Sequence, residues 1–112
     1  MESKDAVAAL AALAQASRLA VFRALVEAGP ERLAASEIAA PLGLPANTLS
    51  FHLKALVHAQ LATARPQGRY IYYAAGFAQM DALIAFLTQN CCGGRPCLPA
   101  AAHPRRSPAR DD

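Results

Sequence analysis

The chain has 112 residues, enough for one domain, and its formal net charge at pH 7 is +3. Alanine and leucine dominate the apolar residues, which favours helices. The residues that follow Met1 lack the features of a signal peptide, and no apolar stretch is long enough to cross a bilayer. We therefore expect a cytoplasmic, mainly helical protein that has no membrane partner.

Two helices are expected in the first 30 residues. The first, at residues 6–14, has a narrow apolar stripe suited to packing on a partner helix, formed by Val7, Leu10 and Leu13. The second, at residues 17–28, has an apolar face formed by Leu19, Phe22, Leu25 and Val26. We expect Arg18 on this helix to be solvated. Gly29 followed by Pro30 ends the helix.

The stretch from Pro45 to Leu56 predicts a short amphipathic helix. Its buried face is formed by Leu49, Leu53 and Leu56. Its other face has groups that hydrogen-bond base edges or pair with phosphate, namely Asn47, Thr48, Ser50 and Lys54. A helix from Ser36 to Leu42, with Ser36 as its N-cap, precedes it, and Gly43 and Leu44 make the turn. This is the helix-turn-helix pattern, although an ordinary helical hairpin has it too.

A β-hairpin is predicted after these helices. Residues 61–65 and 69–74 flank the sequence Pro-Gln-Gly, and the second segment is rich in β-branched and aromatic residues. Arg65 and Arg69 should lie at or near the tip, where they would form the wing of a DNA-binding domain. The alternative is a core hairpin whose arginines keep its edge soluble.

Charge supports the DNA-binding interpretation. No Asp or Glu occurs between Glu37 and Asp81, whereas Lys54, Arg65 and Arg69 lie in this span. A uniformly cationic segment suits a polyanionic partner, although chance can produce it in a chain with few charges.

The last helix is expected at residues 76–90, and its apolar face is wider than a small domain needs. We expect this helix to form a dimer interface together with the first helix, rather than only to pack on its own core. The predicted interface residues are Leu10, Leu13, Phe77, Met80, Leu83, Ile84 and Leu87. The expected fold is thus mainly α with a small β-hairpin, a winged helix-turn-helix in residues 1–90. Residues 98–112 lack apolar periodicity, and we expect a disordered tail there.

The three cysteines lie in one segment, residues 91–97. In a reducing compartment, Cys91, Cys92 and Cys97 are expected to bind a metal or to be redox-active rather than to form disulfides. Three thiolates form a soft site that suits trivalent arsenic or antimony, whereas zinc normally takes four ligands. Neighbouring residues of a regular helix point about 100° apart, so the helix must end or unwind before Cys91 and Cys92 can share one ion. Gly93 and Gly94 permit that.

Taken together, these elements resemble the ArsR/SmtB family of winged-helix repressors from about Leu10 to Asn90. The resemblance is carried by Ser17-Arg18-Leu19, by the run from Thr48 to Leu56, and by Arg65 to Arg69 followed by Tyr72-Tyr73.

Three positions bear on how closely the chain follows the family pattern. Phe51 stands where a polar residue is usual, and it would either contact a thymine methyl group or lie at the domain surface. Gln60 stands where glycine is usual. His52 matches a common position, and we expect it to be partly buried and hydrogen-bonded rather than a metal ligand.

The resemblance implies a non-enzymatic protein that binds an inverted repeat in double-stranded operator DNA as a homodimer. Its two recognition helices would enter successive major grooves about 34 Å apart. It also implies release of the DNA when a metal or metalloid binds. We expect no catalytic residue and no organic cofactor.

Two inducer sites known in the family are missing. The helix at residues 37–42 has no cysteine, and no histidine follows Asp81 on the last helix. The thiols of residues 91–97 remain, so we expect As(III) as the inducer, with Sb(III) as a second one. A redox sensor, a Cd²⁺, Hg²⁺ or Zn²⁺ sensor, and a DNA-binding protein without an inducer are the alternatives.

Overall fold

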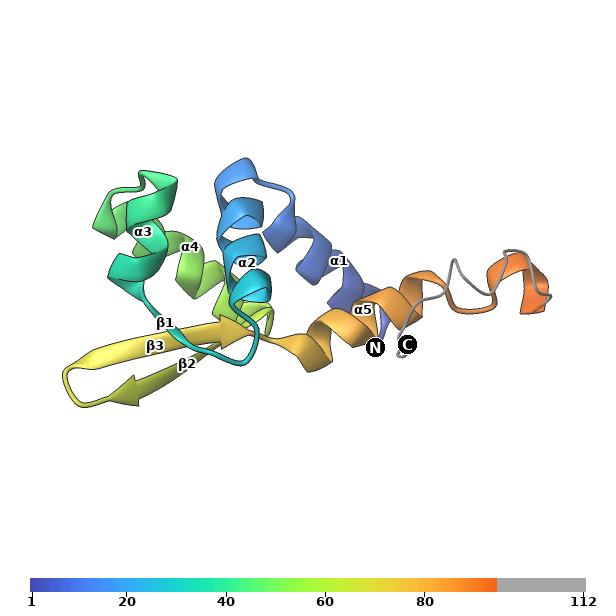
Figure 1. The fold of residues 1–112 in the computed structure, drawn as a ribbon. Coiled ribbons are helices and arrows are strands. Elements are labelled where there is room, and N and C mark those ends of the chain that lie inside the picture. The colour runs from blue at the N-terminus through green and yellow to red at the C-terminus, as the bar shows by residue number, and fades with distance from the viewer. Residues whose placement is uncertain (95–112) are drawn as a thin grey trace.

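The computed structural model describes residues 1–94, and Cys97 and the expected tail at 98–112 lie outside them. The elements in chain order (Figure 1) are α1 (Ser3–Leu13), α2 (Ala16–Ala28), β1 (Leu33–Ala34), α3 (Ala35–Leu42), α4 (Ala46–His58), β2 (Ala62–Gln67), β3 (Tyr70–Ala75), α5 (Phe77–Leu87) and the 3₁₀ turn η1 (Cys91–Gly94). This is a mainly helical winged helix-turn-helix with a small antiparallel hairpin, as the sequence predicts.

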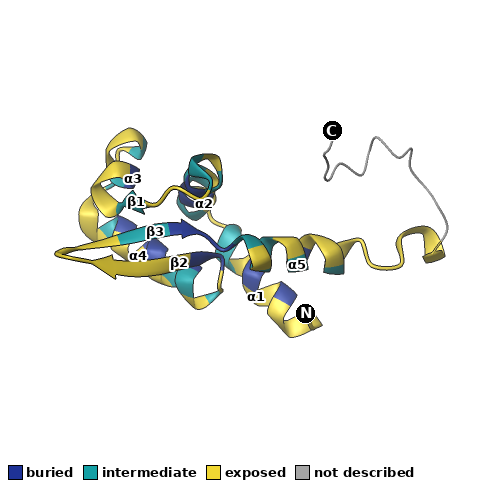
Figure 2. Cartoon of the chain, turned by 60° about the horizontal axis from the view of Figure 1, so that its bottom comes forward, coloured by how far each residue is buried: buried dark blue, intermediate teal, exposed yellow. Residues whose placement is uncertain are grey.

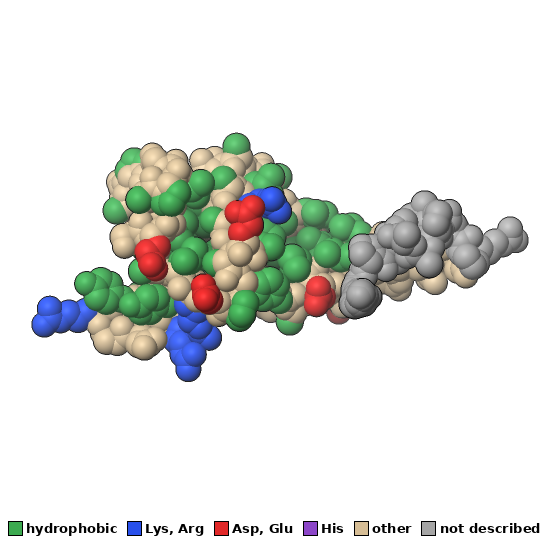
Figure 3. All heavy atoms as spheres, in the orientation of Figure 1, with side chains coloured by type: hydrophobic (Ala, Val, Ile, Leu, Met, Phe, Trp, Pro, Cys, Tyr) green, Lys and Arg blue, Asp and Glu red, His purple; other side chains and the backbone are tan. Residues whose placement is uncertain are grey.

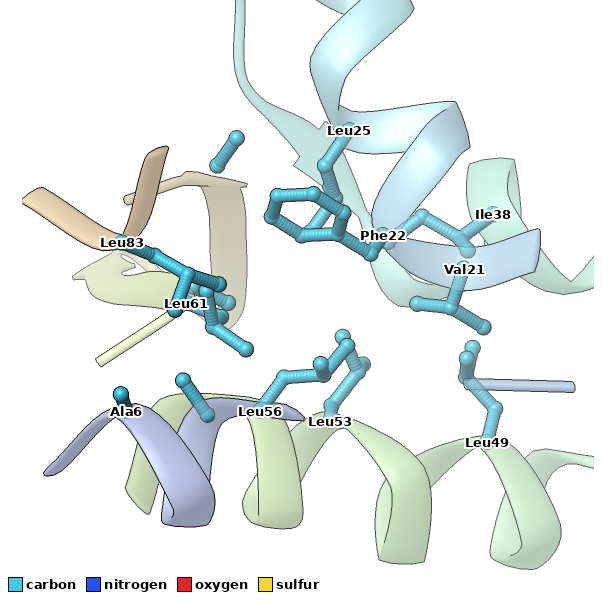
Figure 4. Packing of buried hydrophobic residues seen from close by; sticks show 13 residues of the cluster. Ala6, Val21, Phe22, Leu25, Ile38, Leu49, Leu53, Leu56, Leu61 and Leu83 are labelled. Atoms are coloured by element: carbon cyan, nitrogen blue, oxygen red, sulfur yellow. The ribbon is translucent and has the colours of Figure 1, made fainter. Parts of the chain in front are cut away.

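The core lies where α2 crosses α4. Figure 4 shows the two sets of side chains that face each other, Val21, Phe22 and Leu25 from α2 and Leu49, Leu53 and Leu56 from α4. The three leucines of α4 are at most 1% exposed, which confirms the predicted buried face. Each fully buried side chain of this size contributes about 1.5–3 kcal/mol to stability, so this contact fixes how α4 is presented.

The buried face of α2 differs from the predicted one. Helix α1 packs on the core through the small residues Ala6 and Ala9, while Val7 and Leu10 of the stripe predicted to pack on a partner helix are exposed by 64% and 42%. On α2, Leu19 is 46% exposed. The α2 face is instead set by its contact with α4, a partner that sequence periodicity does not reveal.

Helix α3 begins one residue earlier than expected. The backbone N–H of Ala34 donates to the Glu37 carboxylate at 2.7 Å, so Ala34 is the N-cap position and Ser36 lies inside the helix. The N-cap assignment of Ser36 was therefore wrong. Gly43 closes α3 in the left-handed conformation with φ of 66°, which places the turn before α4 where it was expected.

The hairpin is longer than predicted and belongs to a three-stranded antiparallel sheet of order β1-β3-β2. Gln67 pairs with Tyr70, so Gly68 and Arg69 form the turn, and Pro66 lies inside β2. Proline is tolerated there because β2 is an edge strand. Arg65 is opposite Tyr72 in the strand rather than at the tip. The short strand β1, which pairs with β3, was not predicted.

The connections around the sheet depend on two backbone positions. Gln60 has φ of 65°, a conformation that glycine adopts more easily, and this residue turns the chain from α4 into β2. Gly76 precedes α5, and a Cβ atom there would overlap the carbonyl oxygen of Gln60. The end of the sheet and the start of α5 therefore pack closely against this turn.

Helix α5 ends at Leu87, three residues before the predicted end, and the Thr88 hydroxyl donates to the carbonyl of Ile84 at 2.9 Å. Figure 2 shows that much of α5 is exposed in the single chain. Within the described residues, no single helix is long and apolar enough to cross a membrane. Helices α1 and α2 together have the length and composition of a membrane span, but the chain bends by 99° between them.

Candidate nucleic-acid interface

The outer face of α4 has the polar groups that the sequence places there. Asn47, Ser50 and Lys54 are exposed and Thr48 is half-buried, on the side opposite the buried leucines. The side-chain oxygen of Asn47 accepts the backbone N–H of Thr48 at 2.9 Å. An α-helix that is exposed in this way fits the major groove of B-DNA.

The hairpin places two cations beside this helix. Arg65 and Arg69 are exposed on β2 and in the turn, and β2 contacts α4. Figure 3 shows cationic side chains projecting at the hairpin end of the molecule, whereas acidic side chains lie over the body of the domain. The residues of α4 and of the hairpin themselves include no carboxylate, because the chain has none between Glu37 and Asp81.

The hairpin also exposes apolar side chains that sequence reasoning missed. Tyr70 and Ile71 are 63% and 47% exposed, next to the turn. The Tyr70 ring packs beside that of Tyr72 with centroids 6.4 Å apart. Successive side chains of a strand point to opposite faces, so alternation alone could not have predicted that both residues are exposed.

A buried contact ties the recognition helix to the N-terminal helices. His52 of α4 is 6% exposed, and its Nδ1 lies 3.4 Å from Nη1 of Arg18 on α2. Arg18 also donates through Nε to the carbonyl oxygen of Ala12 in α1 at 2.7 Å. The expectation that His52 is buried and hydrogen-bonded is confirmed. Arg18 is half-buried rather than solvated, because α2 crosses α4 at this point.

Two of the three predicted thiols lie within the described residues, just after α5. The Sγ atoms of Cys91 and Cys92 are 3.8 Å apart, and both residues are exposed. Asn90 and Cys92 have positive φ values of 57° and 55°, so the chain leaves the helical path here. Among residues 1–94, no three His, Cys, Asp or Glu side chains are grouped closely enough to hold a metal ion.

The predicted interface residues divide into two groups. Leu10, Ile84 and Leu87 are exposed by 42%, 53% and 57%. The others pack on the core of their own chain: Leu83 is buried, and Leu13, Phe77 and Met80 are half-buried. In the single chain, therefore, α1 and α5 contact each other and leave an apolar surface uncovered.

Comparison with known proteins supports the same architecture. Residues 13–64 match the family model of a helix-turn-helix domain. NolR from Sinorhizobium fredii is 30% identical, with 80% of this chain and 86% of that chain covered and a TM-score of 0.61. An ArsR-like transcriptional regulator from Rhodococcus sp. RHA1 is 26% identical, with 77% and 78% covered and a TM-score of 0.67.

The chain belongs to the ArsR family of transcriptional regulators. It is therefore a DNA-binding protein of a non-enzymatic family, and α4 and the hairpin are the recognition helix and the wing of an ArsR-type domain. The same fold occurs in the homodimeric winged helix-turn-helix DNA-binding domain of a Mycobacterium bovis protein, which is 24% identical, with 86% of this chain and 89% of that chain covered and a TM-score of 0.61. A comparison with curated protein sequences finds no match.

Proposed function

We propose that this ArsR-family regulator is a homodimeric repressor that binds an inverted repeat in operator DNA and releases it when As(III) binds to Cys91, Cys92 and Cys97. Sb(III), which has the same three-coordinate thiolate chemistry, is the second inducer. The observation that carries the proposal is the position of the thiols: they follow directly after α5, the helix that exposes Ile84 and Leu87.

The homodimer is supported by the uncovered apolar surface of α1 and α5. Val7, Leu10, Ile84 and Leu87 are each 42–64% exposed in the single chain. A surface of this kind is stabilised when a second copy covers it, and a twofold axis places the same residues on both sides. The solved relative from Mycobacterium bovis is homodimeric, which agrees with this assembly.

The DNA contacts are proposed for the outer face of α4 and for the wing. Hydrogen bonds to base edges would come from the side chains of Asn47, Thr48 and Ser50. Lys54 would pair with a phosphate. Arg65 and Arg69 would contact the DNA backbone or the minor groove beside the recognition helix. Phe51, on the same face of α4, is the apolar member of this set.

The thiol distance supports a shared ligand. Two thiolates of a tetrahedral Zn²⁺ site, each bound at about 2.3 Å, lie about 3.8 Å apart, and the narrower angles of pyramidal As(III) bring them somewhat closer. The Sγ atoms of Cys91 and Cys92 are 3.8 Å apart, so one soft ion fits between them with little movement. Cys97 would supply the third thiolate, and it lies five residues further along the chain.

Ligand binding would act through the end of α5. Bonds from one As(III) to Cys91, Cys92 and Cys97 would restrain the segment that follows α5 and shift its packing at the interface between the two copies. A change in how the copies meet alters the spacing of the two recognition helices. A coupling of about 1–3 kcal/mol between the two sites is enough to lower operator affinity 5–150-fold.

The test is fluorescence anisotropy of a labelled duplex from the region upstream of the coding sequence, titrated with arsenite, antimonite, Zn²⁺, Cd²⁺ and peroxide. Each of C91S, C92S and C97S should bind the duplex like the wild type but lose arsenite-driven release. If arsenite still released the duplex from all three variants, the assignment of the inducer site to these cysteines would be wrong. Release of the wild type by peroxide but not by arsenite would instead identify a redox switch at Cys91 and Cys92, whose short separation also suits oxidation.

A further inference from the structure

Phe51 is the apolar residue at the middle of the recognition surface. Its side chain is 65% exposed, although a phenylalanine gains free energy when it is buried. With about 100° per helical residue, it points about 160° away from both Leu49 and Leu53, and lies about 40° from Asn47 and 60° from Lys54. The ring therefore does not pack against the core, and it lies on the same face of α4 as two side chains proposed to contact DNA.

The orientation of the ring is restricted by its neighbours. The Phe51 ring contacts the His52 ring edge-on, with centroids 5.7 Å apart and an angle of 64° between the planes. His52 is in turn buried and lies within 3.4 Å of the Arg18 guanidinium. A ring held in this way loses little conformational freedom when it meets a partner surface.

We propose that Phe51 is a specificity-determining residue that reads thymine through its 5-methyl group in the major groove. This inference rests on the proposed operator binding by α4. The thymine methyl is the apolar group that a base pair presents in the major groove, and an aromatic side chain buries it by direct contact. Cytosine has only a hydrogen at C5 and an amino donor at C4, and guanine presents the acceptors N7 and O6, so neither base offers the ring an apolar group to bury.

The experiment begins with duplexes enriched by the wild-type protein from a random-sequence DNA library. In the tightest-binding duplex, each thymine is then replaced in turn by deoxyuridine, which removes the methyl group and preserves base pairing. The dissociation constants are measured by fluorescence anisotropy. We expect one thymine in each half-site whose replacement weakens wild-type binding about fourfold, the equivalent of one buried methyl group, and about fifteenfold when both half-sites are changed.

Two variants distinguish a contact with the thymine methyl group from a loss of DNA affinity that does not depend on the methyl group. Phe51→Ala should bind the thymine and deoxyuridine duplexes equally. Lys54→Ala, its matched control on the same face, should weaken binding to both duplexes and keep the fourfold ratio between them. Because both side chains are exposed, neither substitution should change the thermal unfolding temperature, which is measured alongside.

Each result decides the inference. A deoxyuridine penalty that vanishes only in Phe51→Ala supports it. An enriched duplex in which no thymine methyl matters, or a penalty that persists in Phe51→Ala, overturns the role of Phe51 and leaves the proposed function standing. Failure of the wild-type protein to enrich any sequence would overturn both.

Discussion

At the scale of single residues, Arg18 joins three helices. Its guanidinium contacts the Ala12 carbonyl at 2.7 Å and Nδ1 of His52 at 3.4 Å. A guanidinium only donates hydrogen bonds, so Nδ1 of His52 is the acceptor in this contact. The imidazole in turn packs edge-on against the Phe51 ring. Through these contacts, the helix proposed to lie at the interface between two copies is connected to the recognition helix.

Arg18→Ala should lower the free energy of unfolding by about 1–3 kcal/mol, because it leaves two partly buried acceptors without their donor. The matched control is Arg23→Ala on the same helix. Arg23 forms an exposed i,i+4 ion pair with Glu27 at 3.3 Å, so its loss should cost about 0.5 kcal/mol or less. Urea unfolding followed by circular dichroism measures both. Equal losses in the two variants would contradict the buried contact.

At the scale of elements, the wing presents its arginines at two different places. Arg65 lies within β2, opposite Tyr72, and Arg69 lies in the turn. Among residues 1–94, β2 is an edge strand of the sheet, and both arginines are exposed. The two arginines are thus separated along the hairpin and would meet different phosphates rather than the same one.

Arg65→Ala and Arg69→Ala should each weaken DNA binding by a similar factor for all sequences, since phosphate contacts carry no sequence information. In a dimer each arginine occurs twice. The negative slope of log K for DNA association against log salt concentration should therefore become shallower by about 1.8 for each substitution. The slope is measured by fluorescence anisotropy titrations between about 50 and 200 mM KCl. Arg23→Ala on α2 serves as the control and should leave the slope unchanged.

At the scale of the whole molecule, Val7, Leu10, Ile84 and Leu87 of α1 and α5 are exposed within residues 1–94. The core between α2 and α4 is well filled, but much of α1 and α5 is exposed (Figure 2). Leu83 is the buried residue of α5, and Phe77, Met80 and Phe86 also pack on the core. Ile84 and Leu87 are exposed. One helix therefore serves two surfaces, which explains why its apolar face is wider than the domain needs.

Leu87→Glu should shift the protein from dimer to monomer and abolish tight operator binding, because each copy would place a charge in the shared surface. A loss of about 2 kcal/mol or more in dimerisation free energy is expected for a central residue of this kind. Leu19→Glu is the matched control, since Leu19 is 46% exposed on α2, outside the proposed interface. Analytical ultracentrifugation measures both variants. A dimer that persists in Leu87→Glu would contradict the assignment.

Local patterns in the sequence were enough to find most elements of this protein. Apolar spacing located α4 and its buried leucines, and a β-branched segment after Pro-Gln-Gly located the hairpin. These features depend on neighbours within a few residues, because helical and strand periodicities are local. The thiol segment could be predicted as a donor set from residue types alone, and its role as an inducer site stays a prediction.

Only the tertiary structure showed which segments that are distant in the sequence contact one another. It alone revealed that β1 pairs with β3, that Arg18 reaches His52 34 positions away, and that Leu19 and Val7 face outward. It also placed the hairpin turn at Gly68 and Arg69, because strand register depends on both strands together. Spacing along one segment indicates that a face is apolar, but only the packed chain determines which partner covers that face and which side chains remain exposed.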